Sequence, residues 1–110
     1  MQEKRLFERE GITLSVKLSS ESKINDIEAK ALDISPLGVG LISEVPLDKG
    51  LALEIRVELP GNEQIYLRGE VVWSAKIEDK IRIGVRLDDP EVIKVAKILA
   101  RYKTPEVYKL

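Results

Sequence analysis

Arginines near the start of the chain have a spacing that suits the binding of phosphate or guanine. Arg5 and Arg9 are four residues apart, and Lys4 precedes them. A guanidinium presents a planar fork of donors that matches phosphate oxygens or the O6 and N7 acceptors of guanine, and it also stacks on base planes. Taken alone, the spacing is more typical of a solvated segment, because charged side chains are usually exposed.

A second candidate group lies where an alternating apolar segment leads into a turn. Asp33, Ser35 and Gly38 form an Asp-x-Ser-x-x-Gly sequence. The carboxylate can accept hydrogen bonds from the ring N–H and amino group of guanine, and the hydroxyl can donate to a phosphate or tie the turn. Glycine permits a close backbone approach or a positive φ. Residues 35–38 also fit an ordinary type I turn, with proline second and glycine fourth.

Together the two groups offer donors for phosphate and acceptors for guanine. Charge-assisted hydrogen bonds contribute about 1.5–3 kcal/mol each, so about four to six of them exceed the roughly 8 kcal/mol of micromolar binding. Ordering a flexible segment costs about 1 kcal/mol per residue. We therefore expect residues 1–10 to be a flexible arm that becomes ordered over a ligand, and residues 11–110 to form the folded domain.

Composition narrows the class of protein. A chain of 110 residues favours one domain with one core. The absence of cysteine and histidine removes disulfides, thiolate metal sites and the commonest general base. A net charge of -1 provides no overall basic field for long nucleic acids. With no apolar run long enough for a membrane span and a charged start unlike a signal peptide, we expect a cytoplasmic protein.

Strand patterns dominate the rest of the chain. Apolar residues alternate with polar ones in segments separated by short turns, at residues 12–18, 27–33, 39–43, 51–59, 65–73 and 81–87. This spacing predicts an all-β domain, mainly a six-stranded antiparallel barrel with its core inside. Asp89 and Pro90 then predict the start of one amphipathic helix. Its apolar face comprises Val92, Val95, Ala96, Leu99 and Tyr102.

Two further residues are secondary candidates for ligand binding. Trp73 shares the alternation of Leu67 and Val71, so an inward core or rim position is favoured over stacking on a base. Arg86 faces outward and can add a phosphate contact or remain solvated. Arg82 repeats the four-residue spacing with Arg86, but residues four apart on a strand share a face, and this solvent face requires no ligand.

The sequence resembles the PilZ domain family. The motif residues match in order and at a similar separation: Arg5, Arg9, Asp33, Ser35 and Gly38. The segment ALDISPLGVGL at 31–41 resembles the family's second strand, turn and third strand, and LRGEVVWS at 67–74 and IRIGVRL at 81–87 resemble its last two strands. The resemblance therefore covers nearly the whole chain.

Membership of this family implies a six-stranded barrel with a C-terminal helix and a cyclic di-GMP site on its outer surface. By resemblance, Arg5 and Arg9 clamp guanine and phosphate, Asp33 and Ser35 read guanine, and Gly38 permits the turn. In that family the residue before the first arginine influences whether one nucleotide or an intercalated pair binds. Here it is Lys4, which leaves the number of bound nucleotides open.

We therefore expect a stand-alone receptor or adaptor that binds cyclic di-GMP and signals to a partner protein, without enzymatic activity, cofactor, metal or membrane insertion. A PilZ-like adaptor of pilus or motility assembly that binds only protein is the alternative. An enzyme is disfavoured because the chain has no histidine or cysteine and Ser35 has no evident base. A hydrolase pairing Asp33 with Asp26 or Glu28 is compatible with the spacing, but nothing in the sequence places a substrate there. A single-strand nucleic-acid binder is disfavoured by 5% aromatic content and the near-neutral charge.

Overall fold

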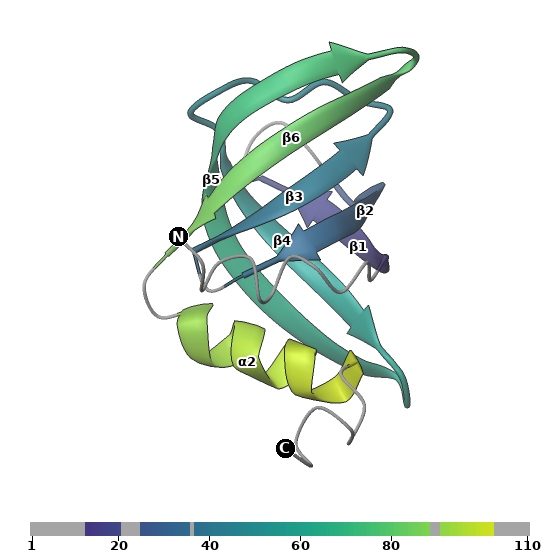
Figure 1. The fold of residues 1–110 in the computed structure, drawn as a ribbon, viewed down its shortest axis with the longest axis vertical. Helices are drawn as coiled ribbons and strands as arrows, with labels where there is room; N and C mark the ends of the chain where they lie inside the picture. Colours follow the sequence, from purple (N-terminus) through teal and green to yellow (C-terminus); the bar gives the residue numbers. More distant parts are fainter. Residues whose placement is uncertain (1–12, 21–24, 36, 89–90, 103–110) are drawn as a thin grey trace.

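A computed structural model describes residues 13–20, 25–35, 37–88 and 91–102 (Figure 1). The predicted arm, with Lys4, Arg5 and Arg9, lies outside the described residues, as do Asp89 and Pro90. The described elements are β1 (Leu14–Ser19), β2 (Ile27–Ile34), β3 (Gly38–Ser43), β4 (Ala52–Leu59), β5 (Glu63–Ile77), β6 (Lys80–Leu87) and α2 (Glu91–Tyr102).

The six strands close into an antiparallel barrel, which confirms the predicted fold class (Figure 1). Their order around the barrel is β1-β2-β3-β6-β5-β4, and β1 completes the ring by pairing with both β2 and β4. Closure gives each strand two neighbours, which satisfies backbone groups that an open edge would leave unpaired. The main difference from the prediction is β5, which continues to Ile77 rather than ending at Trp73.

Branched aliphatic side chains fill the barrel, as the alternating pattern predicts. Leu18, Leu41, Ile55, Leu67 and Ile83 come from five different strands, and each has 0% of its surface exposed. Burial of each such side chain contributes about 1.5–3 kcal/mol relative to exposure. Because the inward positions are occupied by this core, ligand-binding groups must lie on the outer face.

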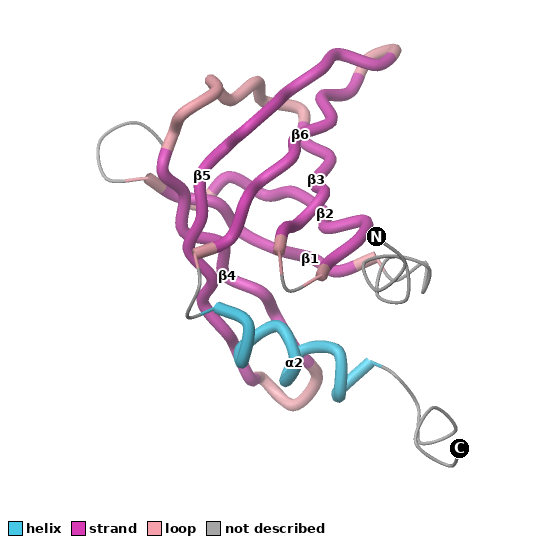
Figure 2. Tube along the Cα trace, turned by 60° about the vertical axis from the view of Figure 1, so that its left-hand side comes forward, coloured by secondary structure: helices cyan, strands magenta, loops and turns pink. Residues whose placement is uncertain are grey.

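Helix α2 lies at one end of the barrel and packs against β5 (Figure 2). Val95, Ile98 and Leu99 are buried in the core cluster, whereas Ala96, predicted to be buried, is exposed. The prediction for Ala96 is wrong because turning the helix to bury Ile98 removes much more apolar surface from water. Within the described part of the chain, no helix has the length and apolar character needed to span a membrane.

Candidate functional site

An open groove of about 350 Å³ crosses the outer face of β2, β3, β6 and β5, four strands that are consecutive around the barrel. Its volume lies within the range of about 300–1,000 Å³ that is typical of small-molecule sites. The groove is lined by every predicted ligand residue that the structure describes: Asp33, Ser35, Gly38, Trp73 and Arg86. Larger hollows of about 530 and 720 Å³ contain none of them. We therefore take the groove as the candidate site.

A β-bulge turns Asp33 toward this groove. Ala31 is buried and pairs with Leu41, but Asp33 pairs with the next residue of β3, Gly40, so Leu32 is an extra residue in β2. Such an insertion reverses the face used by the residues that follow it. Without the bulge, strict alternation would direct the carboxylate into the apolar interior. With it, Asp33 is partly exposed and lines the groove.

A second bulge places Trp73 on the outer face, so the inward position predicted for this residue is wrong. Val71 is buried and pairs with Val85, whereas Trp73 pairs with Gly84, which leaves Val72 as the extra residue of β5. The reversal of alternation at this point leaves Trp73 with 47% of its surface exposed. The indole is consequently accessible to a ligand that lies in the groove.

Two glycines form the floor of the groove between the side chains of Asp33 and Trp73. Gly40 of β3 and Gly84 of β6 are paired in register. A methyl group on Gly40 would lie 2.7 Å from Oδ1 of Asp33, and one on Gly84 would overlap the indole Nε1 of Trp73. Any larger residue would thus displace one of the two groups, because atoms at these distances collide.

Sequence analysis missed both floor glycines as functional positions. A glycine inside a strand weakens the strand and often marks a place where another group approaches closely. Gly40 and Gly84 each interrupt an otherwise regular strand segment, and this was the available signal. Their mutual pairing was not readable, because it depends on the register of β3 against β6.

The predicted turn is present, and the hydroxyl of Ser35 stabilises it. The N–H groups of Leu37 and Gly38 each donate to Oγ of Ser35 at 3.3 Å, and N–H of Ser35 donates to the carbonyl of Gly38 at 2.9 Å. Ser35 has only 4% of its surface exposed. Of the roles predicted for this hydroxyl, the geometry therefore supports tying the turn.

Gly38 is required for close packing. A methyl group at this position would lie 2.7 Å from the carbonyl oxygen of Val85, so a side chain would force β3 away from β6. Its φ is not among the positive values found at Gly50 and Gly61. The close approach of two backbones, rather than a left-handed conformation, explains glycine at this end of the groove.

We predict that Ser35→Ala lowers the free energy of unfolding by about 1–2 kcal/mol, because the N–H of Leu37 loses its acceptor and the N–H of Gly38 keeps only the carbonyl oxygen of Ser35. Urea denaturation of the ligand-free protein measures this change. Ser15→Ala, at an exposed position of β1, is the matched control and should remain within about 0.5 kcal/mol of wild type. Equal midpoints for Ser35→Ala and wild type would show that the hydroxyl does not stabilise the turn.

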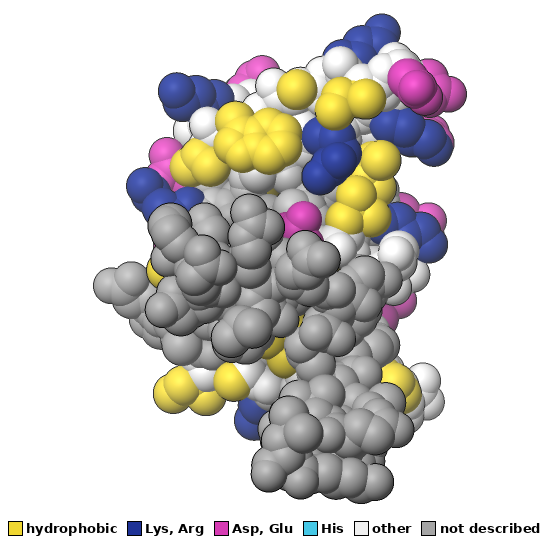
Figure 3. Space-filling model, viewed as in Figure 1, with side chains coloured by type: hydrophobic (Ala, Val, Ile, Leu, Met, Phe, Trp, Pro, Cys, Tyr) yellow, Lys and Arg dark blue, Asp and Glu magenta, His cyan; other side chains and the backbone are white. Residues whose placement is uncertain are grey.

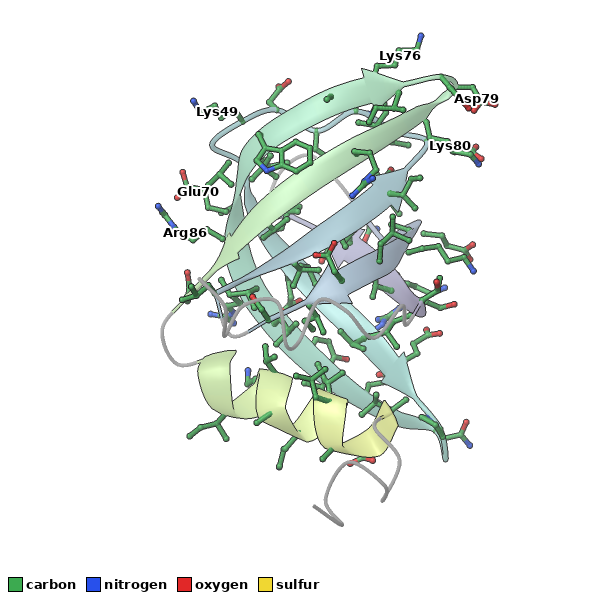
Figure 4. All side chains as sticks on the ribbon, viewed as in Figure 1. Lys49, Glu70, Lys76, Asp79, Lys80 and Arg86 are labelled. Atoms are coloured by element: carbon green, nitrogen blue, oxygen red, sulfur yellow. The ribbon has the colours of Figure 1, made fainter. Side chains whose placement is uncertain are left out.

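Basic and apolar side chains lie next to each other on the barrel face seen in Figure 3. Nη2 of Arg86 donates to Oε1 of Glu70 at 2.7 Å, with 66% of the arginine side chain and 44% of the glutamate side chain exposed (Figure 4). Exposed ion pairs contribute about 0–1 kcal/mol, so Arg86 can exchange Glu70 for a phosphate at little cost. Arg82 also lines the groove, although sequence analysis assigned it no ligand.

Comparisons with known proteins identify the family. A family model described as the PilZ domain matches residues 3–103. The solved structure of the Bacillus subtilis inhibitor of motility (MotI/DgrA) matches with a TM-score of 0.60 and 14% sequence identity, covering 84% of this chain and 48% of that one. This chain thus spans about half the length of that protein, and at this identity the likeness concerns the fold. No curated protein matches the sequence. Because the family model spans nearly the whole sequence, the chain belongs to the PilZ domain family.

Proposed function

We propose that this protein is a receptor for cyclic di-GMP that acts as a binding module rather than as an enzyme. The observation that supports the proposal is the convergence of Asp33, Ser35, Gly38, Trp73 and Arg86 on one groove. They come from three segments of the chain: residues 33–38, β5 and β6. Together they place a carboxylate, an indole and a guanidinium on one part of the outer surface, which is a combination suited to a guanine nucleotide.

The groove offers complementary groups for a guanine base. The carboxylate of Asp33 accepts hydrogen bonds from the ring N–H and the amino group of guanine. Three indole atoms of Trp73, Nε1, Cε2 and Cδ1, lie close to the methyl position above Gly84, so the ring covers this glycine. Its outer face can stack a base, an interaction that contributes about 1–3 kcal/mol. A base held by both groups lies across the glycine floor.

The phosphates require cations that the groove supplies only in part. Arg86 lies beside the turn, where it pairs in register with Gly38. In our proposal Arg5 and Arg9 supply further guanidinium groups when the N-terminal arm closes over the nucleotide, with Lys4 beside them. Closure would change the surface that the protein presents, and a partner protein that recognises the closed form would receive the signal.

Isothermal titration of the full chain with cyclic di-GMP tests this proposal. Wild type should bind with a dissociation constant of about 1 μM or lower, corresponding to about 8 kcal/mol. Arg9→Ala should weaken binding about tenfold or more through the loss of a charge-assisted contact. Arg56→Ala removes an arginine on β4 that pairs with Asp26 outside the groove, and it serves as the control that should bind like wild type.

The same titration separates the alternatives. If wild type produces no binding signal, the protein-only adaptor of pilus or motility assembly becomes the better explanation. Hydrolysis is tested by chromatography of cyclic di-GMP after prolonged incubation with the protein. Recovery of the intact cyclic nucleotide agrees with a receptor, whereas a linear product would contradict a purely binding role.

A further inference from the structure

Arg82 differs from the other arginines whose side chains the structure describes. Each of the others has a carboxylate nearby: Arg56 lies 3.6 Å from Asp26, Arg68 lies 3.9 Å from Glu54, and Arg86 lies 2.7 Å from Glu70. For Arg82 there is no such carboxylate within the described ranges, and its Nε is shielded from solvent without a hydrogen-bond partner there. The Nε of Arg56 also has no hydrogen-bond partner among the described residues, but the guanidinium of Arg56 forms an ion pair with the carboxylate of Asp26.

The position of Arg82 in β6 places it at one end of the glycine floor. Arg82, Gly84 and Arg86 alternate along the strand and therefore share its outer face. Arg86 pairs with Gly38 beside the turn, whereas Arg82 pairs with Ile42, further along β3. The two arginine Cα atoms are about 13 Å apart along the strand, at a rise of about 3.3 Å per residue. The groove thus has a cation toward each end and Trp73 between them, over Gly84.

We propose that Arg82 is an additional ligand-binding residue, which donates to acceptor atoms of the nucleotide at the end of the groove away from the turn. This inference rests on the proposed function. A shielded guanidinium nitrogen without an acceptor is unfavourable, and a bound acceptor removes that penalty. The planar fork matches a pair of acceptors, which in this ligand are either two phosphate oxygens or O6 and N7 of guanine.

Substitution of Arg82 measures its contribution. Arg82→Gln should weaken cyclic di-GMP binding about tenfold or more, because a charge-assisted contact is lost. Arg56→Gln, which removes the same charge from a partly buried arginine outside the groove, should bind like wild type. Arg82→Lys keeps the charge but loses the fork, so it should restore only part of the affinity. Thermal melts of all variants check that each one is folded.

A ligand analogue distinguishes the two acceptors. Titrations with cyclic di-GMP and with its 7-deazaguanine counterpart are compared for wild type and Arg82→Gln. If Arg82 binds the base edge, the loss of N7 weakens wild type but not the variant. If Arg82 binds phosphate, Arg82→Gln weakens the binding of both ligands by the same factor relative to wild type. Either result supports the proposal. Equal affinity of wild type and Arg82→Gln for cyclic di-GMP would overturn the proposed role of Arg82 and leave the receptor function standing. No binding by wild type would overturn the receptor function and this inference together.

Discussion

Replacing Asp33 by alanine is expected to lower the affinity for cyclic di-GMP about a hundredfold or more. One carboxylate can accept two hydrogen bonds from one guanine, each contributing about 1.5–3 kcal/mol, and a hundredfold change in affinity corresponds to about 2.8 kcal/mol. In the described part of the structure, no hydrogen bond or ion pair involves this carboxylate. Its removal should therefore leave the barrel folded and affect mainly the ligand.

Titration calorimetry with two further variants makes this test specific. Asp33→Asn keeps the shape and one acceptor oxygen but loses the charge and gains a donor, so its affinity should fall between those of wild type and Asp33→Ala. Asp79→Ala removes the same charge from the exposed turn between β5 and β6, and its affinity should stay within about twofold of wild type (Figure 4). Wild-type affinity for Asp33→Ala would show that guanine is not read at this position.

The barrel could be predicted because its signals are local. Alternation of apolar residues identifies each strand, and short polar segments identify the turns. Leu67 and Ile83 illustrate this, since each was placed inward from its neighbours alone and is fully buried. The helix was found from Asp89 and Pro90, but the choice of its buried face was partly wrong, because Ile98 rather than Ala96 packs into the core.

The groove could be predicted only in part, because it depends on register. Asp33, Ser35 and Gly38 were selected from their spacing, and the structure places them together. A bulge, however, adds one residue without a distinctive sequence, so the outward position of Trp73 could not be read from alternation. The floor glycines and Arg82 were missed for a related reason: their neighbours are on other strands, and cross-strand partners emerge only when the barrel closes.

The two bulges have a common consequence for the site. One precedes Asp33 in β2 and the other precedes Trp73 in β5, while β3 and β6 lie between these strands. Each bulge turns a side chain outward opposite a glycine of the intervening pair. A carboxylate and an indole therefore lie on one small surface without bulky neighbours beneath them. This arrangement makes the size of residue 84 a determinant of the position of the indole.

Gly84→Ala is accordingly expected to weaken cyclic di-GMP binding about tenfold to a hundredfold, which matches the 1–3 kcal/mol of a base stacked on an aromatic ring. The new methyl group would overlap the indole Nε1 and force the ring of Trp73 off the floor. Trp73 is the single tryptophan of the chain, so its fluorescence reports directly on this position. Emission should shift to longer wavelength in the ligand-free variant as the ring becomes more solvated.

A double-mutant cycle tests whether the glycine acts through the indole. Trp73→Ala should weaken cyclic di-GMP binding by a factor similar to that of Gly84→Ala, because it removes the stacking surface. In the Trp73→Ala protein, adding Gly84→Ala should change affinity by less than about twofold, since the methyl group then has no ring to displace. If the two losses instead multiply, the glycine contributes independently of the indole, for example by contacting the ligand through its backbone. Strong coupling would identify the glycine floor as the feature that positions the stacking residue.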